Sequence, residues 1–221
     1  MILSESDLDV VLIDSVSPVY IFLHGLNNNK DSWSNWRKYF KIKRKNFIIF
    51  NRPGYQNYEK DNSMKFDLSF YVSLIDYLVK TYIKKDQKIV LIGHSLGGFI
   101  AINQVLNSRY TINGLILLNS FYRFRTDKLN IDSNHEHWSI ESDLKLVKDN
   151  DFTSYLGLIN TKVIIIQGKN DTVVSVRVGK KMHDSINGSK LITVENANHN
   201  SLLECRKMIV EQANLIFNTI K

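Results

Sequence analysis

The chain has 221 residues, of which 43% are hydrophobic and 23% are charged. That composition excludes a disordered or fibrous protein and is typical of a soluble domain with one continuous core. The formal net charge of +7 is compatible with acidic partners or anionic substrates. The basic cluster Lys41, Lys43, Arg44 and Lys45 has no interleaved aromatic residues, so a solvated surface is the favoured interpretation and nucleic acid is not an expected partner.

Cysteine content and the N-terminus bear on the compartment. The single cysteine, Cys205, excludes an internal disulfide and is compatible with a reducing environment. The first residues lack the basic region and apolar core of a secretory signal. No apolar run is long enough to span a membrane. We therefore expect a cytoplasmic protein.

Short apolar runs alternate with stretches of helical periodicity along most of the chain. The predicted strands are residues 8–13, 19–23, 47–50, 88–92, 114–118, 163–166 and 190–194. The predicted helices are residues 31–40, 67–82, 99–108, 173–186 and 201–220. This alternation predicts an α/β fold with a mostly parallel, doubly wound sheet. In such sheets the chemistry gathers in loops at the carboxyl ends of the strands.

The most informative stretch is residues 88–100, KIVLIGHSLGGFI. Its apolar start is typical of a strand covered on both faces, and it continues into G-x-S-x-G, with Gly93 and Gly97 around Ser95. A Cβ at either glycine is expected to clash where the strand and the following helix approach each other. Ser95 is therefore the candidate nucleophile.

A serine nucleophile needs a base, which a third group must orient. His199 is the preferred base among the six histidines because it follows the last predicted strand, at the active edge of the sheet. His24 is expected to shape a loop, and His94 is expected to point away from Ser95. The remaining histidines lie in an irregular insert or in a helix: His135, His137 and His183.

The acid should also follow a strand. Asp171 follows the 163–166 strand in a turn, where an aspartate can equally serve as a turn residue or helix cap. The competing position, after the 114–118 strand, holds Asn119, which cannot be an anionic partner. The chain order Ser95, Asp171, His199 is the one expected with G-x-S-x-G.

An acyl-transfer site also needs two donors for the oxyanion. The backbone N–H of Leu96, directly after the nucleophile, is the first, and the N–H of Leu26, in the loop after the 19–23 strand, is the predicted second. Each such donor lowers the barrier by about 3 kcal/mol. The side chains of Leu26 and Leu96 would then line the acyl site.

Four segments together resemble the α/β-hydrolase superfamily over nearly the whole chain. They are HGLNNNKDSW, GHSLGG, GKNDTVV and NANHNS, in that order. The resemblance implies a hydrolase without a cofactor or metal. It assigns the catalytic roles to Ser95, Asp171 and His199, and the oxyanion donors to Leu26 and Leu96.

Two loops depart from the superfamily pattern. The loop after the 47–50 strand usually reads Asp-x-x-Gly-x-Gly, whereas here residues 51–56 read NRPGYQ. A glycine often precedes the catalytic histidine, and here Asn198 takes that place; asparagine also tolerates the left-handed conformation. These differences concern the shape of the loops and not the three catalytic positions.

The resemblance also implies one domain, residues 1–221, with residues 121–160 as a lid insert. Side chains available to cover an apolar acyl group are Phe121, Tyr122, Phe124, Trp138, Leu144 and Leu146, with Phe121 and Trp138 assigned to substrate binding. The run His135-Glu136-His137 lacks a third ligand, so a metal is not expected. Arg123 and Arg125 could meet a substrate carboxylate or phosphate, although solvated charges are the favoured interpretation.

The resulting hypothesis is a serine hydrolase that cleaves carboxylic esters through an acyl-enzyme. Two alternatives stay open. One is a thioesterase or esterase that acts on acyl-CoA or acyl-carrier-protein substrates, and the other is a non-catalytic member that binds a ligand or partner. The expected partner is thus a small-molecule or carrier-bound ester. The sequence does not fix the acyl-chain length or the oligomeric state.

Overall fold

The computed structural model describes residues 3–55, 65–124 and 138–217. A seven-stranded sheet in the order β1-β3-β2-β4-β5-β6-β7 forms its centre. Its strands are β1 (Leu8–Val11), β2 (Val19–Leu23), β3 (Asn46–Phe50), β4 (Ile89–His94), β5 (Gly114–Leu118), β6 (Lys162–Gly168) and β7 (Lys190–Val194). Strand β1 runs antiparallel to β3, and the other neighbouring pairs are parallel. The predicted doubly wound α/β sheet is confirmed.

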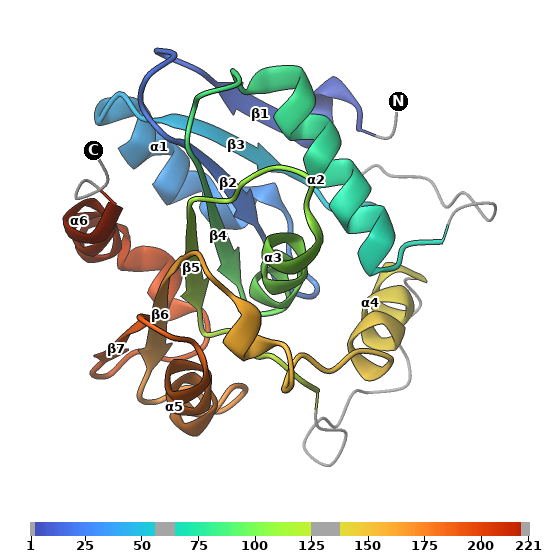
Figure 1. The fold of residues 1–221 in the computed structure, drawn as a ribbon, viewed down its shortest axis with the longest axis vertical. Helices are drawn as coiled ribbons and strands as arrows, with labels where there is room; N and C mark the ends of the chain where they lie inside the picture. The colour runs from blue at the N-terminus through green and yellow to red at the C-terminus, as the bar shows by residue number, and fades with distance from the viewer. Residues whose placement is uncertain (1–2, 56–64, 125–137, 218–221) are drawn as a thin grey trace.

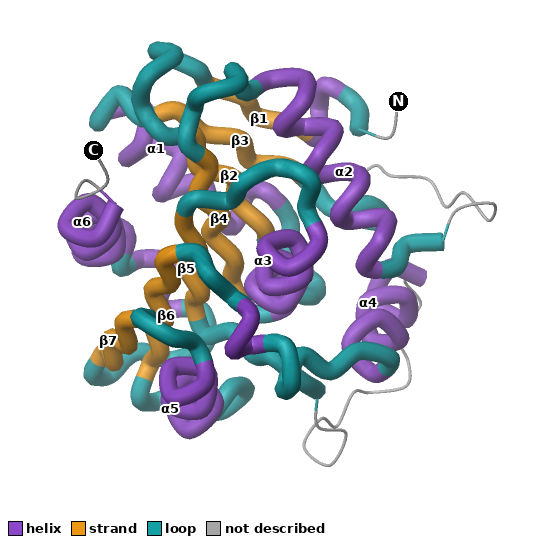
Figure 2. Tube along the Cα trace, viewed as in Figure 1, coloured by secondary structure: helices purple, strands orange, loops and turns teal. Residues whose placement is uncertain are grey.

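Helices cover both faces of this sheet (Figures 1 and 2). They are α1 (Ser34–Ile42), α2 (Leu68–Tyr82), α3 (Leu96–Asn107), α4 (Trp138–Lys148), α5 (Val176–Ser185) and α6 (Arg206–Phe217). Helices α1 and α6 lie on one face, and α2, α3 and α5 lie on the other. Alternate residues of β2 supply the two cores: Phe22 packs with the α1 side, and Ile21 with the α2 and α3 side. Burial on both faces explains the uninterrupted apolar runs of the strands.

Several predicted boundaries were wrong, and side chains that bind the backbone explain why. Strand β1 ends at Val11 because the Asn46 side chain accepts the N–H groups of Ile13 and Asp14, which replaces strand pairing there. The predicted helix at 173 begins only at Val176, after a turn that Asp171 organises.

The start of the helix predicted at residue 31 also differs. A 3₁₀ turn, η2 (Lys30–Trp33), precedes α1, and the side chain of Asn29 caps it by accepting the N–H of Asp31. The residue that caps this start is therefore Asn29. The last predicted helix likewise begins with a 3₁₀ turn, η5 (Ser201–Glu204), before α6.

Part of the 121–160 insert can be described. Helix α4 and the short turn η4 (Leu156–Leu158) belong to it, and α4 lies farther from the sheet than α3, near the start of α2 (Figure 1). Over the described ranges, the helices are too short or too polar to cross a bilayer.

Candidate active site

Ser95 lies in a sharp turn between the end of β4 and the start of α3. Its backbone has φ 52° and ψ −121°, and a positive φ in a non-glycine residue persists only where neighbouring groups hold it. The carbonyl of Leu118 accepts the Ser95 N–H at 2.9 Å, and the Ser120 hydroxyl donates to the Ser95 carbonyl at 2.9 Å. The end of β5 therefore fixes the turn that presents Ser95.

The glycines around Ser95 have the steric role that the sequence predicted. A Cβ on Gly93 would lie 2.4 Å from the Cα of Gly98, and a Cβ on Gly97 would lie 2.1 Å from the carbonyl oxygen of Leu23. Both distances are far inside van der Waals contact, so any side chain would force α3 away from the sheet.

The three predicted catalytic side chains meet in one chain of hydrogen bonds. The distance from His199 Nε2 to Ser95 Oγ is 3.1 Å, and the distance from His199 Nδ1 to Asp171 Oδ2 is 2.8 Å. With its proton on Nδ1, the imidazole donates to the carboxylate and can accept the serine proton on Nε2. That arrangement suits general-base catalysis.

Asp171 uses its two oxygens for different purposes. Oδ1 accepts the N–H groups of Val173 and Val174, each at 2.8 Å, whereas Oδ2 faces His199. The residue is buried, so the backbone bonds fix the carboxylate in one orientation. Asp171 thus organises the turn and orients the imidazole at the same time.

Asn119 holds the two loops that carry Asp171 and His199. Its Nδ2 donates to the carbonyls of Asn198 and His199 at 3.0 and 2.9 Å, and its Oδ1 accepts the N–H of Gly168 at 2.8 Å. The sequence pattern excluded Asn119 as the acid but did not predict this supporting role. The sequence feature that could have indicated this role is the position of Asn119 at the carboxyl end of a strand, beside the other loops of the site.

His94 also holds His199. Its Nε2 donates to the His199 carbonyl at 2.8 Å, and the centroids of the two rings are 4.9 Å apart. Among the described atoms, its Nδ1 has no hydrogen-bond partner. Burial, with a further contribution from the nearby His199, lowers the pKa of His94 to about 4, so the ring is neutral.

Two hydrogen bonds to the carbonyl of Gly25 hold the loop after β2 in place. His24 Nδ1 donates to this carbonyl at 2.9 Å, and the Arg52 guanidinium donates to it at 3.0 Å. His24 Nε2 accepts the N–H of Arg52, so His24 is neutral, and burial lowers its pKa well below the usual value. Because a trans peptide directs its C=O and N–H in opposite directions, the N–H of Leu26 points away from this buried network.

The same arginine ties this loop to helix α4. Arg52 Nη1 lies 2.7 Å from Asp143 Oδ1, and the Tyr55 hydroxyl donates to Asp143 Oδ2 at 2.6 Å while it accepts the N–H of Asn27. Burial disfavours a charged guanidinium, but the adjacent Asp143 carboxylate raises the pKa of Arg52 well above its usual value. No sequence pattern predicted this ion pair.

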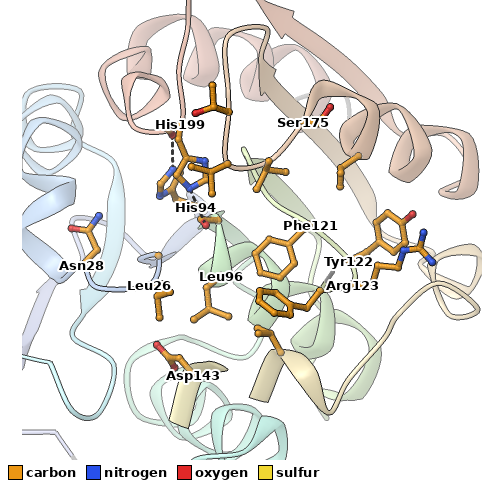
Figure 3. A pocket seen from close by; sticks show the side chains of 18 of the residues that line it. Leu26, Asn28, His94, Leu96, Phe121, Tyr122, Arg123, Asp143, Ser175 and His199 are labelled. Atoms are coloured by element: carbon orange, nitrogen blue, oxygen red, sulfur yellow. Dashed lines mark hydrogen bonds between the residues drawn. The ribbon is translucent and has the colours of Figure 1, made fainter. Parts of the chain in front are cut away.

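A pocket of about 800 Å³ opens beside Ser95 and His199 (Figure 3). Leu26, Leu96 and Phe121, which the sequence assigned to substrate binding, line it. Trp138 does not: it begins α4, and its ring packs against Phe66 with the centroids 5.2 Å apart. Helix α4 reaches the pocket through other residues, namely Asp143, Leu144 and Val147.

The other side chains assigned to the lid have mixed positions. Tyr122 and Phe124 line the pocket, whereas Leu146 is buried in the core between α4 and its neighbours. Arg123 also lines the pocket. Arg125 and the run from His135 to His137 lie outside the described residues.

Comparison with known proteins agrees with this architecture. The sequence model described as "alpha/beta hydrolase fold" matches residues 18–140, more than half of the chain. The chain belongs to the α/β-hydrolase family. A second model, described as "TAP-like protein", matches residues 126–213 of this α/β-hydrolase.

Individual relatives of this α/β-hydrolase support the same placement. A Mycoplasma pneumoniae protein named "Putative esterase/lipase 2" is 38% identical over 102 residues, which cover 45% of this chain and 36% of that protein. The chain thus matches little more than a third of that curated relative.

Two solved structures resemble nearly the whole molecule. A lipase-esterase related protein from Clostridium acetobutylicum has a TM-score of 0.80 at 19% identity, covering 98% of this chain and 100% of that one. MenH from S. aureus has a TM-score of 0.77 at 17% identity, covering 93% and 97%. At such identities the likeness establishes the fold alone.

Proposed function

We propose that this α/β-hydrolase cleaves carboxylic esters through an acyl-enzyme intermediate on Ser95. The observation that carries the proposal is the hydrogen-bonded chain from Ser95 Oγ through His199 to Asp171, with distances of 3.1 and 2.8 Å. The name of the Mycoplasma relative, an esterase/lipase, supports the same reaction class.

In the first half-reaction, Ser95 Oγ attacks the ester carbonyl carbon while His199 Nε2 takes the serine proton. The Asp171 carboxylate accepts a hydrogen bond from the Nδ1–H group and stabilises the imidazolium. The tetrahedral intermediate collapses, the bond to the leaving alkoxide breaks, and His199 returns the proton to it. In the second half, His199 deprotonates a water that attacks the acyl carbonyl carbon. The bond from that carbon to Ser95 Oγ then breaks, His199 returns the proton to Oγ, and the acid is released.

The proposed oxyanion donors are the N–H groups of Leu96 and Leu26. Leu96 is the first residue of α3, and the first N–H groups of a helix have no carbonyl partner within it. The Leu26 N–H belongs to the peptide whose carbonyl His24 and Arg52 hold on the opposite side. Both groups are therefore available to a developing negative charge beside Ser95.

The direct test is pre-steady-state hydrolysis of para-nitrophenyl butyrate. We expect a burst of nitrophenolate stoichiometric with enzyme, and a loss on the order of 10⁴-fold or more in turnover in Ser95→Ala. A folded Ser95→Ala protein with undiminished turnover would exclude Ser95 as the nucleophile.

Labelling with a fluorophosphonate separates an enzyme from a binding protein with the same fold. The reagent should phosphonylate Ser95 in the wild type and leave Ser95→Ala unmodified. Absence of labelling in folded wild-type protein favours a non-catalytic member. Comparing butyryl thioester with butyryl ester turnover then distinguishes a thioesterase from an oxyester hydrolase.

A further inference from the structure

Three cationic side chains line the pocket: Arg123, Arg177 and Lys181. Arg177 and Lys181 are four residues apart on α5, so they lie on the same face of that helix. Arg123 follows β5, where its backbone pairs with Asp151. Figure 3 shows Arg123 on the same side of the pocket as Ser175, which caps α5, and across from Asn28 and His199.

No carboxylate neutralises these cations within the described residues. None of the three forms an ion pair there, and Asp143 is the one carboxylate that lines the pocket among the residues that the structure describes. Asp143 is already bound to Arg52 and to the Tyr55 hydroxyl. The carboxylate of Asp151 accepts from the N–H and hydroxyl of Thr153. Counting only the described parts of the chain, this side of the pocket therefore carries a net positive charge.

Apolar side chains separate the charged side from the nucleophile. Figure 3 shows Phe121 between His199 and Arg123. Leu96 and, on α5, Val178 also line the pocket. A ligand that fills this space would meet the candidate nucleophile at one end, an apolar surface along its body and cationic groups at the other end.

We infer that the substrate is an ester with an anionic group, a carboxylate or phosphate, that binds against Arg123, Arg177 and Lys181 while its carbonyl lies at Ser95. This inference rests on the proposed ester hydrolysis and adds the substrate class. Arginine and lysine are suited to both anions, and the +7 net charge of the chain attracts such a substrate from solution.

The test compares two esters that differ in one terminal group. The first is the para-nitrophenyl monoester of adipic acid, and the second is para-nitrophenyl hexanoate, which has a methyl group where the first has a carboxylate. We expect a higher kcat/KM for the adipate ester in the wild type. Because exposed charge pairs are weak individually, each cation should account for about a two- to fivefold preference.

Helix α5 offers a matched control for the variants. Lys180 is exposed and adjacent to Lys181, but it does not line the pocket. The double variant R177Q/K181Q should lower the adipate-to-hexanoate ratio of kcat/KM by about tenfold, and Arg123→Gln by about threefold. Lys180→Gln should leave the ratio unchanged. A rise from 0.05 to 0.5 M salt should lower the wild-type ratio, because ions screen exposed charges.

An unchanged ratio in R177Q/K181Q, or an equal fall in K180Q, overturns the inference. A phosphonate-terminated ester of the same length distinguishes the two anions, since a preference for the phosphonate assigns a phosphate group and a preference for adipate assigns a carboxylate.

If the wild type hydrolyses none of these esters, the proposed function fails by itself. Calorimetric binding of the adipic monoanilide to Ser95→Ala then decides the inference: affinity that falls in S95A/R177Q/K181Q supports it, and absence of binding overturns it.

Discussion

Arg52 and Asp143 form a buried ion pair across 91 residues of sequence, with 2.7 Å between Nη1 and Oδ1. Their side chains are 0% and 4% exposed. The pair joins the loop after β3 to helix α4, and the same guanidinium donates to the Gly25 carbonyl beside the candidate oxyanion donor Leu26. One arginine thus connects the fold of the insert with the geometry of the site.

Replacing one partner of this pair should lower the free energy of unfolding markedly. In Asp143→Asn the buried guanidinium loses its counter-charge, and breaking such pairs destabilises proteins by about 3–5 kcal/mol. We expect urea denaturation to show a loss of that size. Ester turnover in the folded fraction should also fall, because Arg52 no longer holds the Gly25 carbonyl in place.

A second ion pair provides the control for Asp143→Asn. Lys169 Nζ pairs with Glu195 Oε1, and the two side chains are 46% and 69% exposed. Both groups are solvated after the pair breaks, so Glu195→Gln should cost less than about 1 kcal/mol. Equal destabilisation by the two variants would show that burial does not govern the strength of the Arg52–Asp143 pair.

Local patterns made Ser95, Asp171 and His199 predictable. Ser95 follows a buried strand inside a glycine-rich turn, and the other two each follow a strand of a parallel sheet, so one edge of the sheet collects all three. The parallel sheet itself follows from the same alternation of strands and helices. No local sequence pattern identifies Arg52 and Asp143 as partners. Their pairing depends on where helix α4 of the insert packs against the loop after β3, and the periodicity of the sequence does not encode that position.

The predicted position of Trp138 failed for a related reason. Its aromatic ring fits an apolar acyl site as well as it fits a core, and sequence cannot choose between the two environments. In the structure the first residue of α4 turns toward Phe66, and residues 143, 144 and 147 face the pocket. The supporting roles of Asn119 and His94 were missed because both bind backbone carbonyls, which a side-chain pattern does not show.

Stability should depend on pH through His94. Its pKa is about 4 in the folded protein and 6.5 ordinarily, so between these values the unfolded chain binds a proton that the folded chain does not. The resulting stabilisation is full above pH 6.5 and is lost as the pH falls toward 4, and at pH 5 it has decreased by about 2 kcal/mol.

The measurement is urea denaturation at pH 7.5 and pH 5. In His94→Gln the amide can still donate to the His199 carbonyl but does not titrate, so the loss of stability between the two pH values should be about 2 kcal/mol smaller than in the wild type. His183 is exposed, and His183→Gln should keep the wild-type difference. If His94→Gln also keeps it, another group causes the acid sensitivity.

Asn119→Asp should impair turnover more than folding. The aspartate keeps an acceptor for the Gly168 N–H but places a carboxylate against the carbonyls of Asn198 and His199, which must then separate. Because a displaced base reacts poorly, we expect kcat to fall on the order of 10²-fold with little change in KM.

Asn113 provides a matched control at the other end of β5. Its Oδ1 accepts the N–H of Ile89 at 2.8 Å, and an aspartate there retains that bond far from His199. Asn113→Asp should therefore turn over ester at the wild-type rate. A wild-type kcat in Asn119→Asp would mean that the His199 loop does not depend on Asn119.

Gly97→Ala tests how closely helix α3 must approach β2. The new methyl group would lie 2.1 Å from the Leu23 carbonyl oxygen, a backbone atom that no rotamer change can move. Helix α3 must shift, and with it Ser95 and the Leu96 N–H. We expect a loss of stability of about 1–3 kcal/mol from overpacking and a fall in kcat on the order of 10²-fold from misplacement.

Gly157→Ala is the control, because the nearest atom to its new methyl group is 3.8 Å away, so both the melting temperature and kcat should stay at their wild-type values. Wild-type turnover in Gly97→Ala would show that the position of α3 relative to β2 does not control the reactivity of Ser95.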